Sequence, residues 1–67
     1  MANLDMLNAA IQESGMTMKA IAEKSGMVRE TLYNRLAGKG EFTASEIVGL
    51  TSVLRLSKDE RDQIFLA

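Results

Sequence analysis

Residues 17–38 read TMKAIAEKSGMVRETLYNRLAG, and this stretch decides the fold because it contains two short helical patterns joined by one tight turn. The first pattern turns Ile21 to its inner face, and the second turns Leu32 and Leu36 to its own. Between them, Gly26 supplies the left-handed backbone that ends one helix and lets the next begin. A turn of about three or four residues sets two helices at a steep angle, so the second helix is predicted to lean on the first with its polar face outward.

Start and stop signals extend the helical pattern to the rest of the chain, which contains no proline. A first helix is predicted over about residues 4–14, after Asn3 as its N-cap and before Gly15 as its left-handed end. The remaining predicted helices cover about residues 18–24 after Thr17 as N-cap, about residues 28–37, and two segments that open with the capping boxes of residues 43–46 and 57–60. The predicted fold class is therefore all-α with five helices.

The composition predicts one small domain over residues 1–67, with no room for a second, effector-sensing domain. Apolar residues make up 46% of the chain and the mean hydropathy is −0.03, which argues against both disorder and membrane insertion. The beginning of the chain has no export pattern, so a cytoplasmic location is expected.

Several kinds of chemistry have no support in the sequence. There is no cysteine and no histidine, so disulfides and the usual zinc sites are excluded, and no metal, cofactor or small-molecule ligand is expected. The carboxylates lie scattered at capping and solvent positions rather than in a catalytic pattern. The chain is therefore predicted not to be an enzyme.

Charge is distributed unevenly along the chain. The net charge is −1, which is unusual for a nucleic-acid-binding domain. Residues 17–39 nevertheless carry +3, whereas residues 1–16 and 40–67 carry −2 each. The positive charge is thus concentrated on the pair of helices joined by the turn.

The pattern of this chain resembles the Cro/repressor-like helix-turn-helix domains of phages and bacterial chromosomes. The resemblance is carried by residues 21–27 through the turn, residues 31–32, and residues 36–39. Residues 38–47 are also similar to the loop and fourth helix of small phage proteins of this class. The resemblance implies a lambda repressor-like fold whose second and third helices form the helix-turn-helix and whose third helix enters the major groove of DNA.

The resemblance also implies which residues read the DNA bases. Arg29 would grip guanine, Glu30 would accept from the cytosine amino group, and Asn34 would pair with adenine. Tyr33 would bind a phosphate or pack on a thymine methyl group. These residues also have alternative roles that do not involve DNA. Arg29 could form a surface ion pair with Glu30 or another acid, and Tyr33 could be partly buried at the edge of the core.

Phosphate contacts are implied at six further positions, which flank the two helices: Thr17, Met18, Lys19, Val28, Lys39 and Gly40. Two of them depart from the family pattern, since glutamine is common at Met18 and serine or threonine at Val28. Lys39 has an alternative role as a partner of the helix dipole. Arg35, beside the inner leucines, is predicted to reach the DNA backbone or to pair with an acid of the fourth helix.

The end of the chain is apolar and fits two roles. Ile64, Phe65 and Leu66 can form an isologous interface with a second copy, or they can close the monomer's own core. A homodimer on a pseudo-palindromic operator is the expected mode, because a module of this size gains little affinity alone.

Two functions are consistent with these features of the sequence. The first is a DNA-binding transcriptional regulator, a phage or prophage Cro/repressor-like protein whose partner is double-stranded DNA. The alternative is an antirepressor-like module of the same fold that binds another regulator through outward apolar residues such as Val28 and the C-terminal patch.

Overall fold

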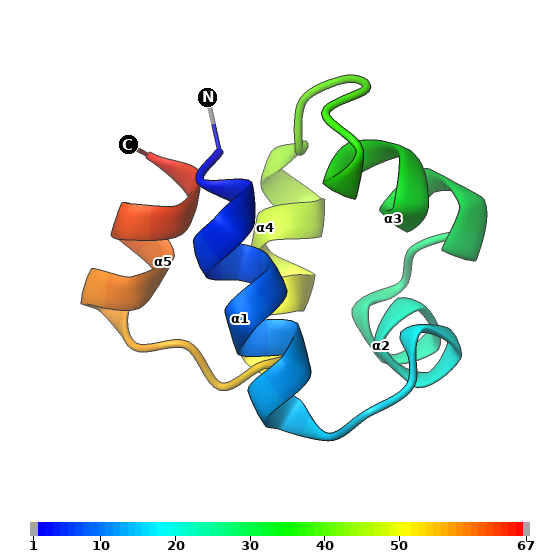
Figure 1. Cartoon of the computed structure of the whole chain (residues 1–67), viewed down its shortest axis with the longest axis horizontal. Coiled ribbons are helices and arrows are strands. Elements are labelled where there is room, and N and C mark those ends of the chain that lie inside the picture. The colour runs from blue at the N-terminus through cyan, green and yellow to red at the C-terminus, as the bar shows by residue number, and fades with distance from the viewer. Residues whose placement is uncertain (1, 67) are drawn as a thin grey trace.

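The computed structural model describes residues 2–66, and within them the backbone forms five α-helices and no strand (Figure 1). The helices are α1 (Leu4–Ser14), α2 (Met18–Ser25), α3 (Arg29–Leu36), α4 (Ala44–Val53) and α5 (Lys58–Phe65). This confirms the predicted all-α class. The predicted limits of the first three helices lie within one residue of the observed ones. For α1 and α2 the reason is that the capping residues that set the limits act locally.

Helices α1 and α2 begin and end at the predicted caps. The side chain of Asn3 accepts a hydrogen bond from the backbone of Met6, and Thr17 does the same for Ala20, each at 3.1 Å. Gly15 and Gly26 end the two helices with φ of 69° and 77°, a conformation that costs glycine little.

Capping boxes open α4 and α5, again as predicted. In α4 the hydroxyl of Thr43 accepts from the amide of Glu46, and the Glu46 carboxylate accepts from the amide of Thr43 at 2.9 Å. Ser57 and Glu60 repeat this exchange at the start of α5. These reciprocal bonds satisfy amides that a helix start leaves unpaired.

The core lies between α4, which is central in Figure 1, and the helices around it. α2 packs against α4 and α3, whereas α5 packs against α1 and α4. The buried residues come from all five helices and are Leu7, Ile11, Ile21, Ala22, Leu32, Leu50, Ile64 and Phe65. None of the helices described over residues 2–66 has the length and hydropathy needed to cross a membrane.

Two of the three C-terminal apolar residues belong to the core of the monomer. Ile64 and Phe65 are buried in the monomer, where they close its own core, so their side chains are not available to a second copy. Leu66 is 70% exposed. The two ends of the described chain lie side by side, and the amide of Asn3 donates to the carbonyl of Ile64 at 2.6 Å (Figure 1).

Gly49 has a role that its place in the sequence did not indicate. Gly49 lies inside α4, a position where glycine disfavours a helix. A Cβ atom at this position would lie 2.5 Å from the carbonyl oxygen of Ser25, the last residue of α2. The absence of a side chain therefore lets the end of α2 approach the α4 backbone.

Replacing threonine by valine is expected to have opposite effects on stability at two positions, Thr51 in α4 and Thr43 at its N-cap. Thr51 Oγ1 is buried with no hydrogen-bond partner among residues 2–66, so Thr51→Val is expected to raise the free energy of unfolding by about 1 kcal/mol. Thr43→Val removes the cap hydroxyl and is expected to lower it by about 1 kcal/mol. Urea unfolding measures both, and a lower midpoint for Thr51→Val would contradict the first expectation.

Candidate nucleic-acid interface

The turn between α2 and α3 fixes the direction in which α3 leaves. The amide of Met27 donates to the carbonyl of Ala22 at 2.9 Å, and the amide of Gly26 donates to the carbonyl of Glu23 at 3.3 Å. Leu32, which is fully buried, holds the inner face of α3 in the core. The polar face of α3 is therefore held outward by the packing of its opposite side.

The four predicted base-reading residues lie on that outer face and are all exposed, a set made up of Arg29, Glu30, Tyr33 and Asn34. Tyr33 is 52% exposed, so it is not a wall of the core. Over residues 2–66 neither Arg29 nor Glu30 takes part in an ion pair. The side chains that could reach base edges are thus not masked by the chain itself.

The beginning of α3 differs from the other helix starts. Val28 is the N-cap residue, its side chain makes no capping hydrogen bond, and it is 70% exposed. Met18, the other departure from the family pattern, is partly buried and packs against the core. At these two positions, a phosphate contact can come only from the backbone.

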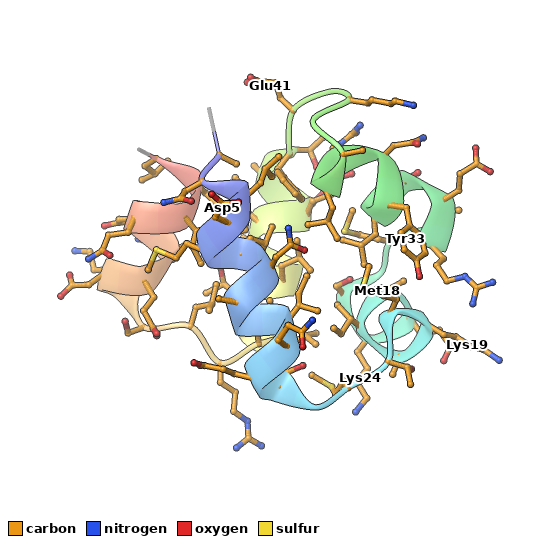
Figure 2. The ribbon with its side chains drawn as sticks, in the orientation of Figure 1. Asp5, Met18, Lys19, Lys24, Tyr33 and Glu41 are labelled. Atoms are coloured by element: carbon orange, nitrogen blue, oxygen red, sulfur yellow. The ribbon has the colours of Figure 1, made fainter. Side chains whose placement is uncertain are left out.

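The beginning of α2 lies on the same side of the molecule as α3. Figure 2 shows Lys19 of α2 and Tyr33 of α3 on the right of the view, whereas Asp5 of α1 lies to the left. Lys24, at the other end of α2, lies next to Met16 instead. Lys19 is exposed, and the Thr17 hydroxyl already caps α2. Arg29 of α3 and Lys39 of the following loop are exposed as well.

The loop after α3 presents the last two predicted phosphate contacts. Lys39 and Gly40 are exposed, and the amide of Lys39 donates to the carbonyl of Asn34 at 2.9 Å. Gly38 and Gly40 have φ of 83° and 85°, which lets the chain reverse direction within the loop. Lys39 has no ion-pair partner within the described residues.

Arg35 pairs with an acid of the fourth helix, which is one of the two alternatives predicted for it. Its Nε atom donates to Glu46 Oε1 at 3.2 Å, and its Nη1 atom donates to the carbonyl of Lys39 at 3.5 Å. The same Glu46 oxygen belongs to the capping box of α4. One guanidinium therefore joins the end of α3, the loop and the start of α4.

Comparison with known protein families supports the assignment that this geometry suggests. Residues 7–61, which span all of the helix-turn-helix and most of the chain, match the family described as helix-turn-helix. The comparisons with curated proteins and with solved structures gave no match. The chain belongs to the lambda repressor-like, Cro/C1-type helix-turn-helix family of DNA-binding regulators.

Proposed function

We propose that the protein is a sequence-specific transcription regulator of the Cro/repressor type that inserts α3 into the major groove of operator DNA. The observation that carries this proposal is the unmasked polar face of α3, which is preceded in the chain by the exposed Lys19 of α2 and followed by the exposed Lys39 of the loop. A helix with polar side chains along one face fits the major groove, where each base pair presents a distinct set of donors and acceptors.

Each outward residue of α3 has a chemical role in this proposal. Arg29, at the start of the helix, donates two hydrogen bonds to guanine O6 and N7. Glu30 selects cytosine by accepting from its amino group and rejects bases that place an acceptor there. Asn34 pairs with adenine, and Tyr33 packs on a thymine methyl group or donates to a phosphate.

Phosphate contacts set the position of the helix in the groove. Lys39 and Gly40 contact the sugar-phosphate backbone on one side of α3, and Lys19 with the backbone at Thr17 contacts it on the other. Within residues 2–66 the amide of Gly40 has no hydrogen-bond acceptor, so it can donate to a phosphate oxygen. These contacts supply affinity and salt dependence but no sequence information.

The operator in this proposal is pseudo-palindromic and is bound by a homodimer in the cytoplasm of a bacterium, with a phage or prophage as the source of the gene. Two half-sites one helical turn apart match two copies related by a two-fold axis. Of the three C-terminal residues proposed for the interface, Leu66 is the one left exposed.

A second candidate is the antirepressor-like module that binds another regulator. The observation that favours it is the exposed apolar surface at Val28 and Leu66, each 70% exposed. An electrophoretic shift assay separates the two candidates. A salt-sensitive shift of genomic DNA fragments supports the regulator, whereas no shift at any salt together with a co-purified larger repressor supports the protein-binding module.

Lys39→Ala tests the phosphate part of the proposal. We expect binding to weaken by a similar factor on every sequence, and the dependence of log K on log salt to fall by about one unit, because one phosphate contact is lost. Lys58→Ala, which removes the same charge at the start of α5, is the matched control and should change the slope much less. Equal slopes for the two variants would contradict the contact.

A further inference from the structure

We infer that Arg35 and Glu46 are positioning residues, which hold the Lys39–Gly40 peptide where it can meet a DNA phosphate. The inference rests on the proposed function, and it assigns Arg35 to the support of the loop rather than to a contact of its own with DNA. Three features of the structure carry it.

The first feature is the set of hydrogen bonds around Lys39. Its amide donates to Asn34 in α3, and its carbonyl accepts from Arg35 Nη1, so both sides of this residue are tied to α3. Arg35 is itself held by Glu46, and the side chains of this pair are only 21% and 15% exposed. Burial of this kind favours a defined geometry over the loose pairing of surface charges.

The second feature is the close packing of the Arg35 guanidinium under Gly40. A Cβ atom on Gly40 would lie 2.6 Å from Arg35 Nη1, so the guanidinium lies directly against the loop backbone. Glycine at this position leaves room for that approach.

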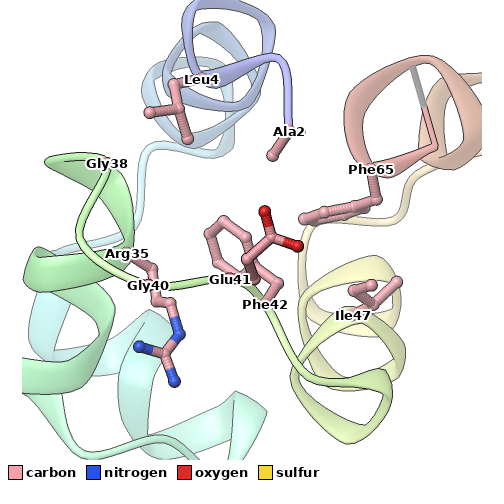
Figure 3. Close-up of a pocket in the computed structure, with 9 residues that line it drawn as sticks. All are labelled: Ala2, Leu4, Arg35, Gly38, Gly40, Glu41, Phe42, Ile47 and Phe65. Atoms are coloured by element: carbon pink, nitrogen blue, oxygen red, sulfur yellow. The ribbon is translucent and has the colours of Figure 1, made fainter.

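The third feature is the lack of other support for the middle of the loop. A cavity of about 280 Å³ lies on its inner side, lined by residues that include Leu4, Gly38, Gly40 and Ile47 (Figure 3). The end of the loop is packed, because the rings of Phe42 and Phe65 meet edge to face at 5.2 Å. Because the core does not fill the space behind Gly40, the guanidinium of Arg35 is the group that fixes the loop there.

Two glutamates allow a test of the inference, because an effect of charge and an effect of loop positioning would change the affinity for DNA in opposite directions. Glu46→Gln and Glu41→Gln each remove one negative charge near the same loop. Figure 3 shows the Glu41 carboxylate pointing away from Arg35, and no hydrogen bond or ion pair of Glu41 appears within residues 2–66. Glutamine also serves in a capping box, so Glu46→Gln keeps the start of α4.

On charge alone, both variants should bind DNA more tightly than the wild-type protein. If Glu46 positions the loop through Arg35, Glu46→Gln instead weakens binding by about threefold, since a charge-assisted bond is replaced by a weaker neutral one. Glu41→Gln should tighten binding by about twofold. Circular dichroism checks that both variants keep their helices.

A double-mutant cycle tests whether Arg35 acts through Lys39. We expect Lys39→Ala to weaken binding by about tenfold in the wild-type background but by less than about threefold beside Arg35→Gln, since a loop no longer held cannot use its lysine. If the two residues contacted phosphates independently, the fold-changes of the two substitutions would instead multiply in the double variant. In the free protein, backbone relaxation measured by NMR should show greater motion at Lys39 and Gly40 in Glu46→Gln, and no change in Glu41→Gln.

The outcomes separate the inference from the function on which it rests. No DNA binding by the wild-type protein overturns the proposed function and the inference together. Wild-type binding with tighter binding by Glu46→Gln, or with independent effects of Arg35→Gln and Lys39→Ala, overturns the inference alone.

Discussion

Gly49→Ala is expected to lower the free energy of unfolding by about 2 kcal/mol, although alanine is the better helix former. In an exposed helix the substitution would stabilise by about 1 kcal/mol. Here the new methyl group would lie 2.5 Å from the carbonyl oxygen of Ser25, an atom of the backbone that no rotamer change can move. Overpacking of this kind costs about 3 kcal/mol, so the clash outweighs the gain in helix propensity.

Thermal unfolding followed by circular dichroism measures this effect, and the midpoint should fall by roughly 10 °C for a domain of this size. Val48→Ala is the matched control, because Val48 is the neighbouring residue of α4 and is 69% exposed. This control should leave the midpoint unchanged or raise it slightly. A Gly49→Ala variant as stable as the wild-type protein would mean that α2 and α4 do not approach this closely.

With the proposed base contact, Arg29→Ala is expected to weaken binding to the preferred site by about tenfold to a hundredfold and to relax the choice of base at the position that Arg29 contacts. The reason is that a guanidinium donating to guanine O6 and N7 distinguishes that base from the other three, whereas a methyl group does not. Sites selected from a random DNA pool, compared between the wild-type and variant proteins, measure both effects.

Lys58→Ala serves as the charge control for this experiment too, since α5 lies at the far side of the molecule from α3 (Figure 1). It should weaken binding little and leave the selected sequence unchanged. If Arg29→Ala weakened all sequences equally, Arg29 would contact a phosphate rather than a base, and the assignment of its role would be wrong.

Features set by local chemistry could be predicted from the sequence. Asn3, Thr17 and Thr43 cap helices in the structure because their side chains reach amides only three residues away. The outward direction of α3 was also predictable, since the spacing of Leu32 and Leu36 assigns the inner face and leaves the polar side chains to solvent.

Features that depend on distant parts of the chain were not predictable, or were left between alternatives. An apolar C-terminus fits a core and an interface equally, and only the packing of α5 on α1 and α4 assigns Ile64 and Phe65 to the core. The approach of Gly49 to Ser25 joins residues from two helices and has no signal in either segment. The sequence left Arg35 between the DNA backbone and an acid of the fourth helix, and the structure identified the acid as Glu46; the hydrogen bond from Arg35 to the carbonyl of Lys39 was not predicted.

The concentration of cations on one side of an acidic protein affects how it approaches a polyanion. With a net charge of −1 the molecule experiences almost no net force at long range, but its separated charges experience a torque. That torque turns α2 and α3 toward the negatively charged DNA before the two molecules make contact. Raising the ionic strength shortens the distance over which DNA can orient the protein. The association rate should therefore fall, even though the net electrostatic attraction is close to zero.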